Sequence, residues 1–200
     1  MNPKDFLILL IVSFLWGGSF LFIRLLVLEG MEPLEIVSMR MLLASIFILP
    51  FLLNRSKKHS FKDHSLSFLL IGILNTALPF TLFAYASLQL GAGSLSVLQA
   101  TVPILTALIL FSLFKNEFSI SKLIGVLIGF VGLYVLVGPG SNFDLFSSIL
   151  CVVASLSYAV AGVYLARTPN KLNNTYIGMG SIIIGCLLYT SPSPRDRVLS

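Results

Sequence analysis

The polar residues best placed to bind a ligand lie in the apolar stretch GAGSLSVLQATVPILTALILF, residues 91–111. At helical spacing, Ser96, Gln99, Pro103 and Thr106 fall on one stripe, where hydroxyl and amide groups can form hydrogen bonds. Pro103 has no N–H to donate to the Gln99 carbonyl, so that oxygen can accept a hydrogen bond from elsewhere. One interpretation is a wall of a wet cavity; the other is a kinked helix satisfied by a neighbouring helix.

Two further stretches hold candidates of the same kind. In LNTALPFTLFAYASLQL, Asn75 and Pro79 share a face with Tyr85 at its edge, and Asn75 either lines the same cavity as Gln99 or hydrogen-bonds a neighbouring helix. In SFLWGGSFLFIRLL, Trp16 lies too deep for an interfacial belt. It either faces a pore, where it can stack on a ligand, or packs between helices.

Arg40 is the most deeply placed cation, because it lies well inside an apolar stretch that begins at Leu34. A buried guanidinium can neutralise an anion or pair with a carboxylate, and such a charge normally faces the interior of a bundle or water. The alternative is that its long side chain reaches back to the surface. For Arg24, nearer the end of its own stretch, we expect that second arrangement.

The chain lacks the usual signals of an enzyme. His59 and His64 share one linker without catalytic partners, and no HExxH, Walker or GxSxG motif is present. Cys151 and Cys186 both lie in apolar stretches and are interpreted as small buried hydrophobes. We therefore expect no catalytic residues, no metal site and no cofactor.

The composition decides which elements must position these residues. Of the 200 residues, 56% are hydrophobic and only 10% are charged, with a mean hydropathy of +0.97. Soluble proteins carry about 25% charged residues, so most of this surface must face lipid. The net charge of +5 comes from short clusters between apolar runs, a pattern without the basic face that nucleic-acid binding needs.

The apolar runs predict an all-α membrane protein, a polytopic helical bundle. A helix needs about 20 apolar residues to cross the hydrocarbon core. Runs of suitable length cover residues 6–28, 34–53, 66–88, 94–114, 120–137 and 145–166, and a seventh begins near residue 176. The linkers are short, so neighbouring helices should be antiparallel. Gly125, Gly129 and Gly132 predict that the fifth helix packs closely against another.

The linkers also predict an orientation. Cations gather on one side of the predicted membrane and carboxylates on the other, and cytoplasmic loops are the ones rich in Lys and Arg. The N-terminus is therefore expected in the cytoplasm. The cations are Lys4, Arg55, Lys57, Lys58, Lys62, Lys115, Lys122, Arg167 and Lys171; the carboxylates are Glu29, Glu32, Glu35 and Asp144.

A weak internal repeat connects the two ends of the chain. When SFLWGGSFLFIRLL is moved by 142 positions it falls on SLSYAVAGVYLART, and Trp16 meets Tyr158. Because five crossings separate the two copies, the second starts from the opposite side of the membrane. This predicts an inverted repeat, a common plan of secondary carriers, and makes Tyr158 a further cavity candidate.

Residues 6–185 resemble the EamA-type transporters of the drug/metabolite transporter superfamily. The resemblance rests on WGGSFLFIRLL, on EPLEIVSMRMLLASIFILP, and on the long stretch from GAGSLSVLQATVPILTALILF to VGLYVLVGP. It implies ten helices in two five-helix halves around a central cavity, and export of metabolites, amino acids or drugs. Residues 6–138 would form the first repeat, and residues 145–185 the start of a truncated second.

The last residues do not fit this plan. Residues 177–189 would span roughly 20 Å as a helix, too little to cross. SPSPRDRVLS then puts Arg195 and Arg197 on the side that otherwise lacks cations, and CLLYTSPSPRDR resembles translated sequencing-adapter read-through. We expect residues 186–200 to be a non-native tail on a chain cut short; the alternative is a genuine Pro-rich tail.

Together these patterns predict a multi-pass transporter that moves a small organic solute across a bacterial-type inner (plasma) membrane by alternating access. Its partners would be the lipid bilayer and the solute, without nucleic acid; a homodimer is left open. Alternatives are a non-transporting membrane subunit, a membrane-embedded enzyme, or a small multidrug-type oligomeric carrier. The predicted substrate-binding residues are Trp16, Asn75, Tyr85, Gln99, Pro103, Tyr158 and, through its charge, Arg40.

Overall fold

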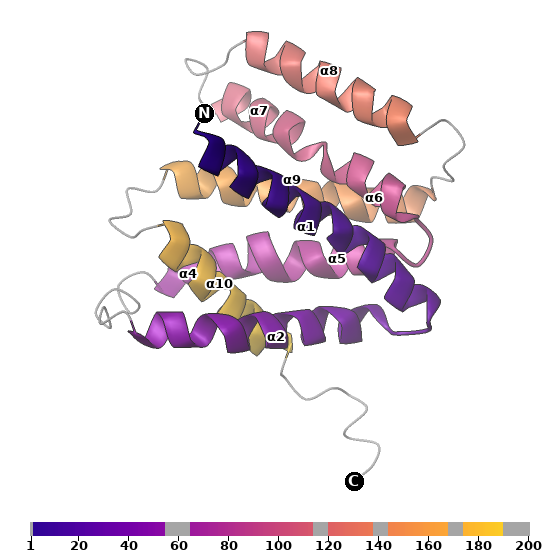
Figure 1. Cartoon of the computed structure of the whole chain (residues 1–200). Coiled ribbons are helices and arrows are strands. Elements are labelled where there is room, and N and C mark those ends of the chain that lie inside the picture. Colours follow the sequence, from indigo (N-terminus) through magenta and orange to yellow (C-terminus); the bar gives the residue numbers. More distant parts are fainter. Residues whose placement is uncertain (1, 55–64, 114–119, 138–143, 168–173, 190–200) are drawn as a thin grey trace.

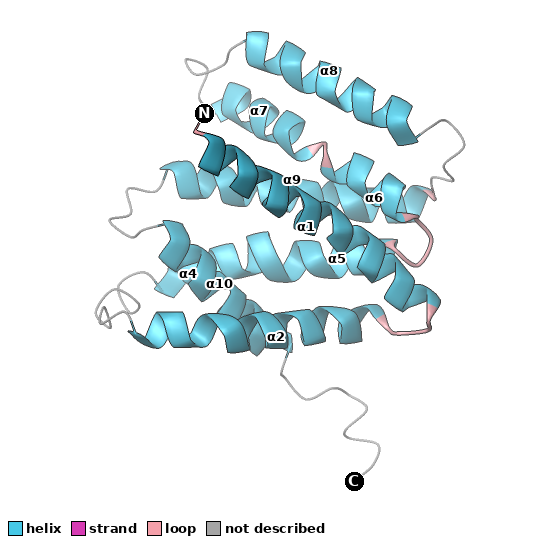
Figure 2. Ribbon diagram, in the orientation of Figure 1, coloured by secondary structure: helices cyan, strands magenta, loops and turns pink. Residues whose placement is uncertain are grey.

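The computed structural model describes residues 2–54, 65–113, 120–137, 144–167 and 174–189, and this part of the chain is a bundle of helices without strands (Figures 1 and 2). The helices are α1 (Pro3–Leu28), α2 (Pro33–Asn54), α4 (Ser65–Gly72), η1 (Ile73–Ala77), α5 (Leu78–Ala86), α6 (Ala92–Gln99), α7 (Val102–Leu113), α8 (Ile120–Val137), α9 (Leu145–Arg167) and α10 (Asn174–Tyr189).

The predicted all-α membrane architecture is confirmed. Within the described residues, five helical stretches are long and apolar enough to span a membrane, among them Pro3–Leu28 and Leu145–Arg167. Their outer side chains are apolar and open; Phe14, for example, is 82% exposed. In water this surface would be costly, but lipid is its natural solvent. The chain is therefore a multi-pass membrane protein.

Two of these spans are interrupted, and in each a proline accounts for the interruption. The span Ser65–Ala86 contains the π-helical turn η1, in which the Leu78 N–H bonds to the Ile73 carbonyl. Pro79 has no N–H for the Asn75 carbonyl, and its ring crowds that oxygen, so the helix widens by one residue. Between α6 and α7, Pro103 acts in the same way, and the helix breaks at Ala100 and Thr101.

Helix α9 occupies the centre of the bundle. It packs against α5 on one side and against α6 and α7 on the other, while α8 lies outside α6 and α7 (Figure 1). Helix α10 packs against α2 and α4, and α1 crosses α6. The buried positions of α9 hold mostly small side chains, such as Ala154 and Ala161, so its neighbours can approach closely.

The predicted close packing of the fifth helix through its glycines is wrong for the described residues. A Cβ added to Gly125, Gly129 or Gly132 of α8 would meet nothing within 4 Å. The glycine spacing is real, but α8 lies at the edge of the bundle with these positions exposed.

Close contact occurs instead where α10 crosses α4. A Cβ on Gly180 would lie 2.5 Å from Cδ1 of Phe68, and one on Gly72 would lie 2.8 Å from Cγ2 of Ile184. Phe68 is completely buried. Glycine is needed at these two positions because any side chain would force the helices apart.

Helix α10 continues through Cys186 to Tyr189, which packs against a cluster formed by Val37, Met41 and Ala84. The Tyr189 hydroxyl donates to the Ala77 carbonyl at 2.7 Å. Residues 190–200 lie outside the described residues. The division into two repeats, and the non-native tail from residue 186, stay predictions.

Candidate functional site

A cavity of about 240 Å³ lies between α1, α2, α5, α6 and α9. Its wall is largely apolar, with aromatic and aliphatic side chains, and its polar groups are an indole, a guanidinium, an amide, a phenol and one serine hydroxyl. Ser19, Phe20, Phe80 and Phe83 share this wall with four of the predicted residues, Trp16, Arg40, Gln99 and Tyr158. Five helices from distant parts of the sequence thus place their side chains around one space.

A second hollow of about 480 Å³ adjoins the first and shares Trp16, Gln99 and Tyr158 with it. Its other lining residues include Asn75, which comes from the π-helical turn, and Pro103, which follows the break between α6 and α7. The side chain of Asn75 forms no hydrogen bond with any described residue. Both helix interruptions therefore border the same hollow.

Trp16 and Gln99 line both hollows and are joined by a hydrogen bond. The indole Nε1–H of Trp16 donates to Oε1 of Gln99 at 3.1 Å, which joins α1 to the end of α6. Trp16 remains half exposed. The indole therefore both packs and lines the cavity, so the two interpretations of this residue are compatible.

Arg40 projects from α2 into the cavity wall. Its guanidinium carbon lies over the ring of Phe80, 4.8 Å from the centroid, a cation–π arrangement. Among the described residues Arg40 has no ion pair and no hydrogen bond. The guanidinium is partly buried yet keeps its hydrogen-bond donors available.

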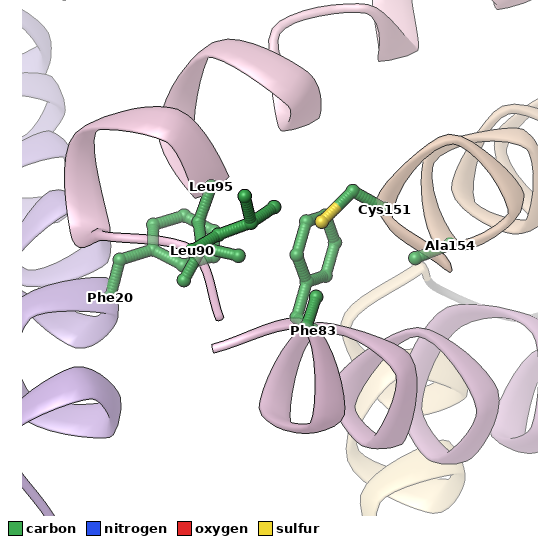
Figure 3. Close-up of a cluster of buried hydrophobic side chains, with 7 residues drawn as sticks. Phe20, Phe83, Leu90, Leu95, Cys151 and Ala154 are labelled. Atoms are coloured by element: carbon green, nitrogen blue, oxygen red, sulfur yellow. The ribbon is translucent and has the colours of Figure 1, made fainter. Parts of the chain in front are cut away.

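Three aromatic side chains of the cavity lining pack against one another. Phe20 meets Phe83 edge to face at 5.4 Å, and Phe83 stacks on Tyr158 at 6.4 Å. Phe20 and Phe83 continue into a buried cluster with Leu90, Leu95, Cys151 and Ala154, beside the turn between α5 and α6 (Figure 3). Leu90 and Leu95 are completely buried, so side chains pack tightly at this end of the bundle, hereafter the sealed end.

Two serines of α9 satisfy carbonyls beside the interrupted helices. The Ser157 hydroxyl donates to the Leu74 carbonyl of η1 at 2.6 Å, and the Ser155 hydroxyl donates to the Leu98 carbonyl near the end of α6 at 3.1 Å. The sequence pattern did not predict these bonds. A signal was present: both serines lie inside an apolar span, where an unpaired hydroxyl is unfavourable.

Arg24, which we expect to reach toward the surface, binds carbonyls at the end of a neighbouring helix, and its place relative to the membrane surface stays a prediction. Its Nη1 donates to the Ser87 carbonyl and, at 3.1 Å, to the Leu88 carbonyl, both at the C-terminal end of α5. A cation suits this position because the last carbonyls of a helix lack helical partners. Arg24 thus fastens α1 to the sealed end.

The structure brings six of the seven predicted site residues together around the two hollows, and Tyr85 is the exception. It lines neither hollow and is 39% exposed. Prediction from the sequence also missed Phe20, Phe80 and Phe83, although Phe20 lies one helical turn after Trp16. Whether any of these residues binds a substrate stays a prediction.

Fold and site together define a multi-pass helical membrane protein with an aromatic, partly polar cavity between its helices. Residues 4–138 match the EamA-like transporter family, and the chain belongs to that family. Within the described residues, no group of three or more His, Cys, Asp or Glu side chains could hold a metal ion.

Curated relatives carry the word transporter in their names. The chain is 29% identical over 195 residues to an uncharacterized transporter of Archaeoglobus fulgidus, covering 94% of this chain and 66% of the relative. It is 32% identical over 156 residues to the uncharacterized inner membrane transporter YedA of Escherichia coli K12, covering 76% of this chain and 50% of the relative. It is 31% identical over 160 residues to the uncharacterized transporter YdfC of Bacillus subtilis, covering 78% and 52%.

The chain thus spans between half and two thirds of the length of these relatives. No solved structure matches it.

Proposed function

We propose that this chain forms part of a secondary transporter that moves a small organic solute across a bacterial-type inner membrane by alternating access. The observation that carries the proposal is the pair of adjoining hollows, bordered by two interrupted helices and by side-chain donors that have no partner among the described residues. Polar groups at membrane depth are costly and normally serve a function. Family membership supports the same conclusion.

The two ends of the bundle support alternating access. The buried cluster around Phe83 and Leu90 lies beside the turn between α5 and α6 and, in this scheme, closes the cavity on that side. With the N-terminus in the cytoplasm, as the distribution of cations predicts, this sealed side faces outward. The hollows would then be reached from the cytoplasm, and transport requires a second arrangement in which this seal opens.

The proposed inverted repeat is supported by the positions of two aromatic residues. Trp16 and Tyr158 are aligned when the sequence of the first span is shifted by 142 positions onto that of the sixth. Each of these two residues lines both hollows. Inverted repeats commonly place equivalent residues about one central site. We accordingly assign residues 6–138 to the first repeat and 145–185 to the start of the second.

Thiol labelling from each side of the membrane tests the proposal. In a chain with Cys151 and Cys186 replaced by Ala, Asn75→Cys and Gln99→Cys are treated with a membrane-impermeant maleimide in right-side-out and in inverted vesicles. Alternating access predicts labelling of both positions from both sides. Gly129→Cys, on the exposed face of α8, is the matched control and should stay unlabelled because it faces lipid.

Labelling of Asn75→Cys and Gln99→Cys from one side alone would support a non-transporting membrane subunit instead. Labelling of Gly129→Cys with neither cavity position reactive would refute the cavity itself. A reporter fused to the N-terminus, or placed at Lys57, tests the orientation, since both should report from the cytoplasm.

A further inference from the structure

The polar groups left available in the cavity are predominantly donors, and this has a bearing on the solute. Trp16 has only an N–H, so the Gln99 oxygen must face the indole for the observed bond to form. The Gln99 amide therefore presents its NH₂ group elsewhere, and it forms no hydrogen bond with a described residue. Arg40, on the same wall, offers further N–H donors and no acceptor.

The charge on the described lining of the cavity is positive. Of the lining residues in the described part of the chain, only Arg40 is ionised, and the others are aromatic, aliphatic, hydroxyl or amide side chains. No carboxylate of the described residues pairs with it. A guanidinium taken partly out of water without a counter-ion is unfavourable, and a bound anion would relieve that cost.

The apolar part of the wall suits a flat ring. Phe20, Phe80, Phe83 and Tyr158 line the cavity beside the charged and amide groups. A cavity of about 150 Å³ is enough for benzene, so the volume of about 240 Å³ found here holds one ring and a small acidic group. Aromatic walls also attract cations, but a cationic ligand would be repelled by Arg40.

We infer that the solute is an organic anion with a flat apolar body, such as an aromatic carboxylate. Its carboxylate pairs with Arg40 and accepts from the Gln99 amide, and its ring lies among the aromatic side chains. This inference rests on the proposed function, because it names the class of solute for the same cavity. Arg40 is a specificity-determining residue in this scheme.

Trp16 is the only tryptophan of the chain and lines the cavity, so its fluorescence reports occupancy directly. The 200-residue chain in nanodiscs of zwitterionic phosphatidylcholine is titrated with benzoate, with the neutral isostere benzamide, and with benzylammonium. Emission is excited at a wavelength where none of these probes absorbs. We expect benzoate to quench Trp16 at concentrations about tenfold or more below those needed for benzamide, the effect of one charge-assisted hydrogen-bonded pair. Benzylammonium should be the weakest of the three.

Arg40→Gln removes the charge and keeps a polar side chain. It should abolish the preference for benzoate over benzamide, while Arg40→Lys, which loses the planar fork, should retain part of it. Lys4→Gln removes a cation outside the cavity and should leave the preference unchanged. An unaltered emission spectrum and melting curve without ligand establish that each variant is folded.

The inference is overturned if benzoate fails to quench Trp16, if benzamide binds as well as benzoate, or if Arg40→Gln keeps the preference. These results are separate from the labelling test of transport. Two-sided labelling without a benzoate preference would reject the organic-anion solute class and retain the transport proposal. A benzoate preference with one-sided labelling would retain the organic-anion class as the ligand and reject alternating access.

Discussion

The crossing of α10 over α4 yields the sharpest prediction on stability. Gly180→Ala places a Cβ 2.5 Å from Cδ1 and 2.6 Å from Cε1 of Phe68, a ring that is completely buried. Carbon atoms pack best at about 3.5–4.0 Å, so the approach is too close by about 1 Å. Phe68 shares a buried cluster with Ile71 and Ile177, so a shift of the ring would disturb the packing of that cluster.

The expected cost is about 1–3 kcal/mol of unfolding free energy, the usual range for overpacking a well-filled core. Unfolding is followed by far-UV circular dichroism as the SDS fraction of mixed micelles is raised. Gly129→Ala is the matched control, since its Cβ would meet nothing within 4 Å. Because alanine is the better helix former, this control should be neutral or up to about 1 kcal/mol more stable than wild type.

A double-mutant cycle with Phe68→Ala identifies the clash as the cause. Phe68→Ala is itself expensive, about 3–5 kcal/mol, but it removes the atoms that the new Cβ would meet. In that background Gly180→Ala should lose most of its cost, a coupling of about 1 kcal/mol or more. If Gly180→Ala behaves like Gly129→Ala, or costs the same with and without the Phe68 ring, the crossing of α10 over α4 is not as described here.

Three further outcomes are expected. Ser157→Ala leaves the Leu74 carbonyl without its hydroxyl donor and should cost about 1 kcal/mol in the same SDS titration, whereas Ser112→Ala, at an exposed site, should be silent. The Asp144 carboxylate accepts a hydrogen bond from the Ser147 N–H at 2.8 Å, and hydrogen bonding to Ser147 lowers the pKa of this carboxyl. Because the folded pKa is the lower one, the stabilisation is present above the unfolded pKa of about 3.9 and is lost as the pH falls through the folded pKa. Melting curves of wild type and Asp144→Asn should therefore differ in pH dependence only in this acid range. Cys151 has no exposed surface in this arrangement, so it should react with a hydrophilic maleimide much more slowly than Gln99→Cys, and equally rapid labelling of the two positions would contradict the buried cluster at the sealed end.

Most of the fold follows from hydropathy. The spans predicted from apolar runs correspond to helices of the structure, because the requirement to satisfy every backbone group within lipid leaves few alternatives. Local backbone chemistry was partly predictable: Pro103 indicated an interruption, and the structure breaks the helix just before it. The π-helical turn before Pro79 was not foreseen, since a proline can be accommodated by a kink, a break or a widened turn.

The candidate site was harder to predict, since it depends on which helices become neighbours. Helical spacing placed Gln99 and Asn75 on the cavity side of their own helices, and it failed for Tyr85, which lies at the edge of such a face. It also assigned the close contacts to the glycines of α8, because GxxxG spacing gives the distance between small residues and leaves the partner helix unspecified. The contacts of Arg24 and of the α9 serines are tertiary: a serine inside an apolar span signals that its hydroxyl needs a partner, but the local sequence does not say which carbonyl accepts from it.

The serines of α9 link the movements of two walls. Ser155 and Ser157 stand two residues apart on one helix, and each is tied to a different interrupted span. A translation of α9 along its axis would therefore break both hydrogen bonds together. Both serine hydroxyls would then need new acceptor carbonyls in the shifted position. The helix break beside Gln99 and the π-helical turn at Asn75 are therefore mechanically coupled to each other through α9.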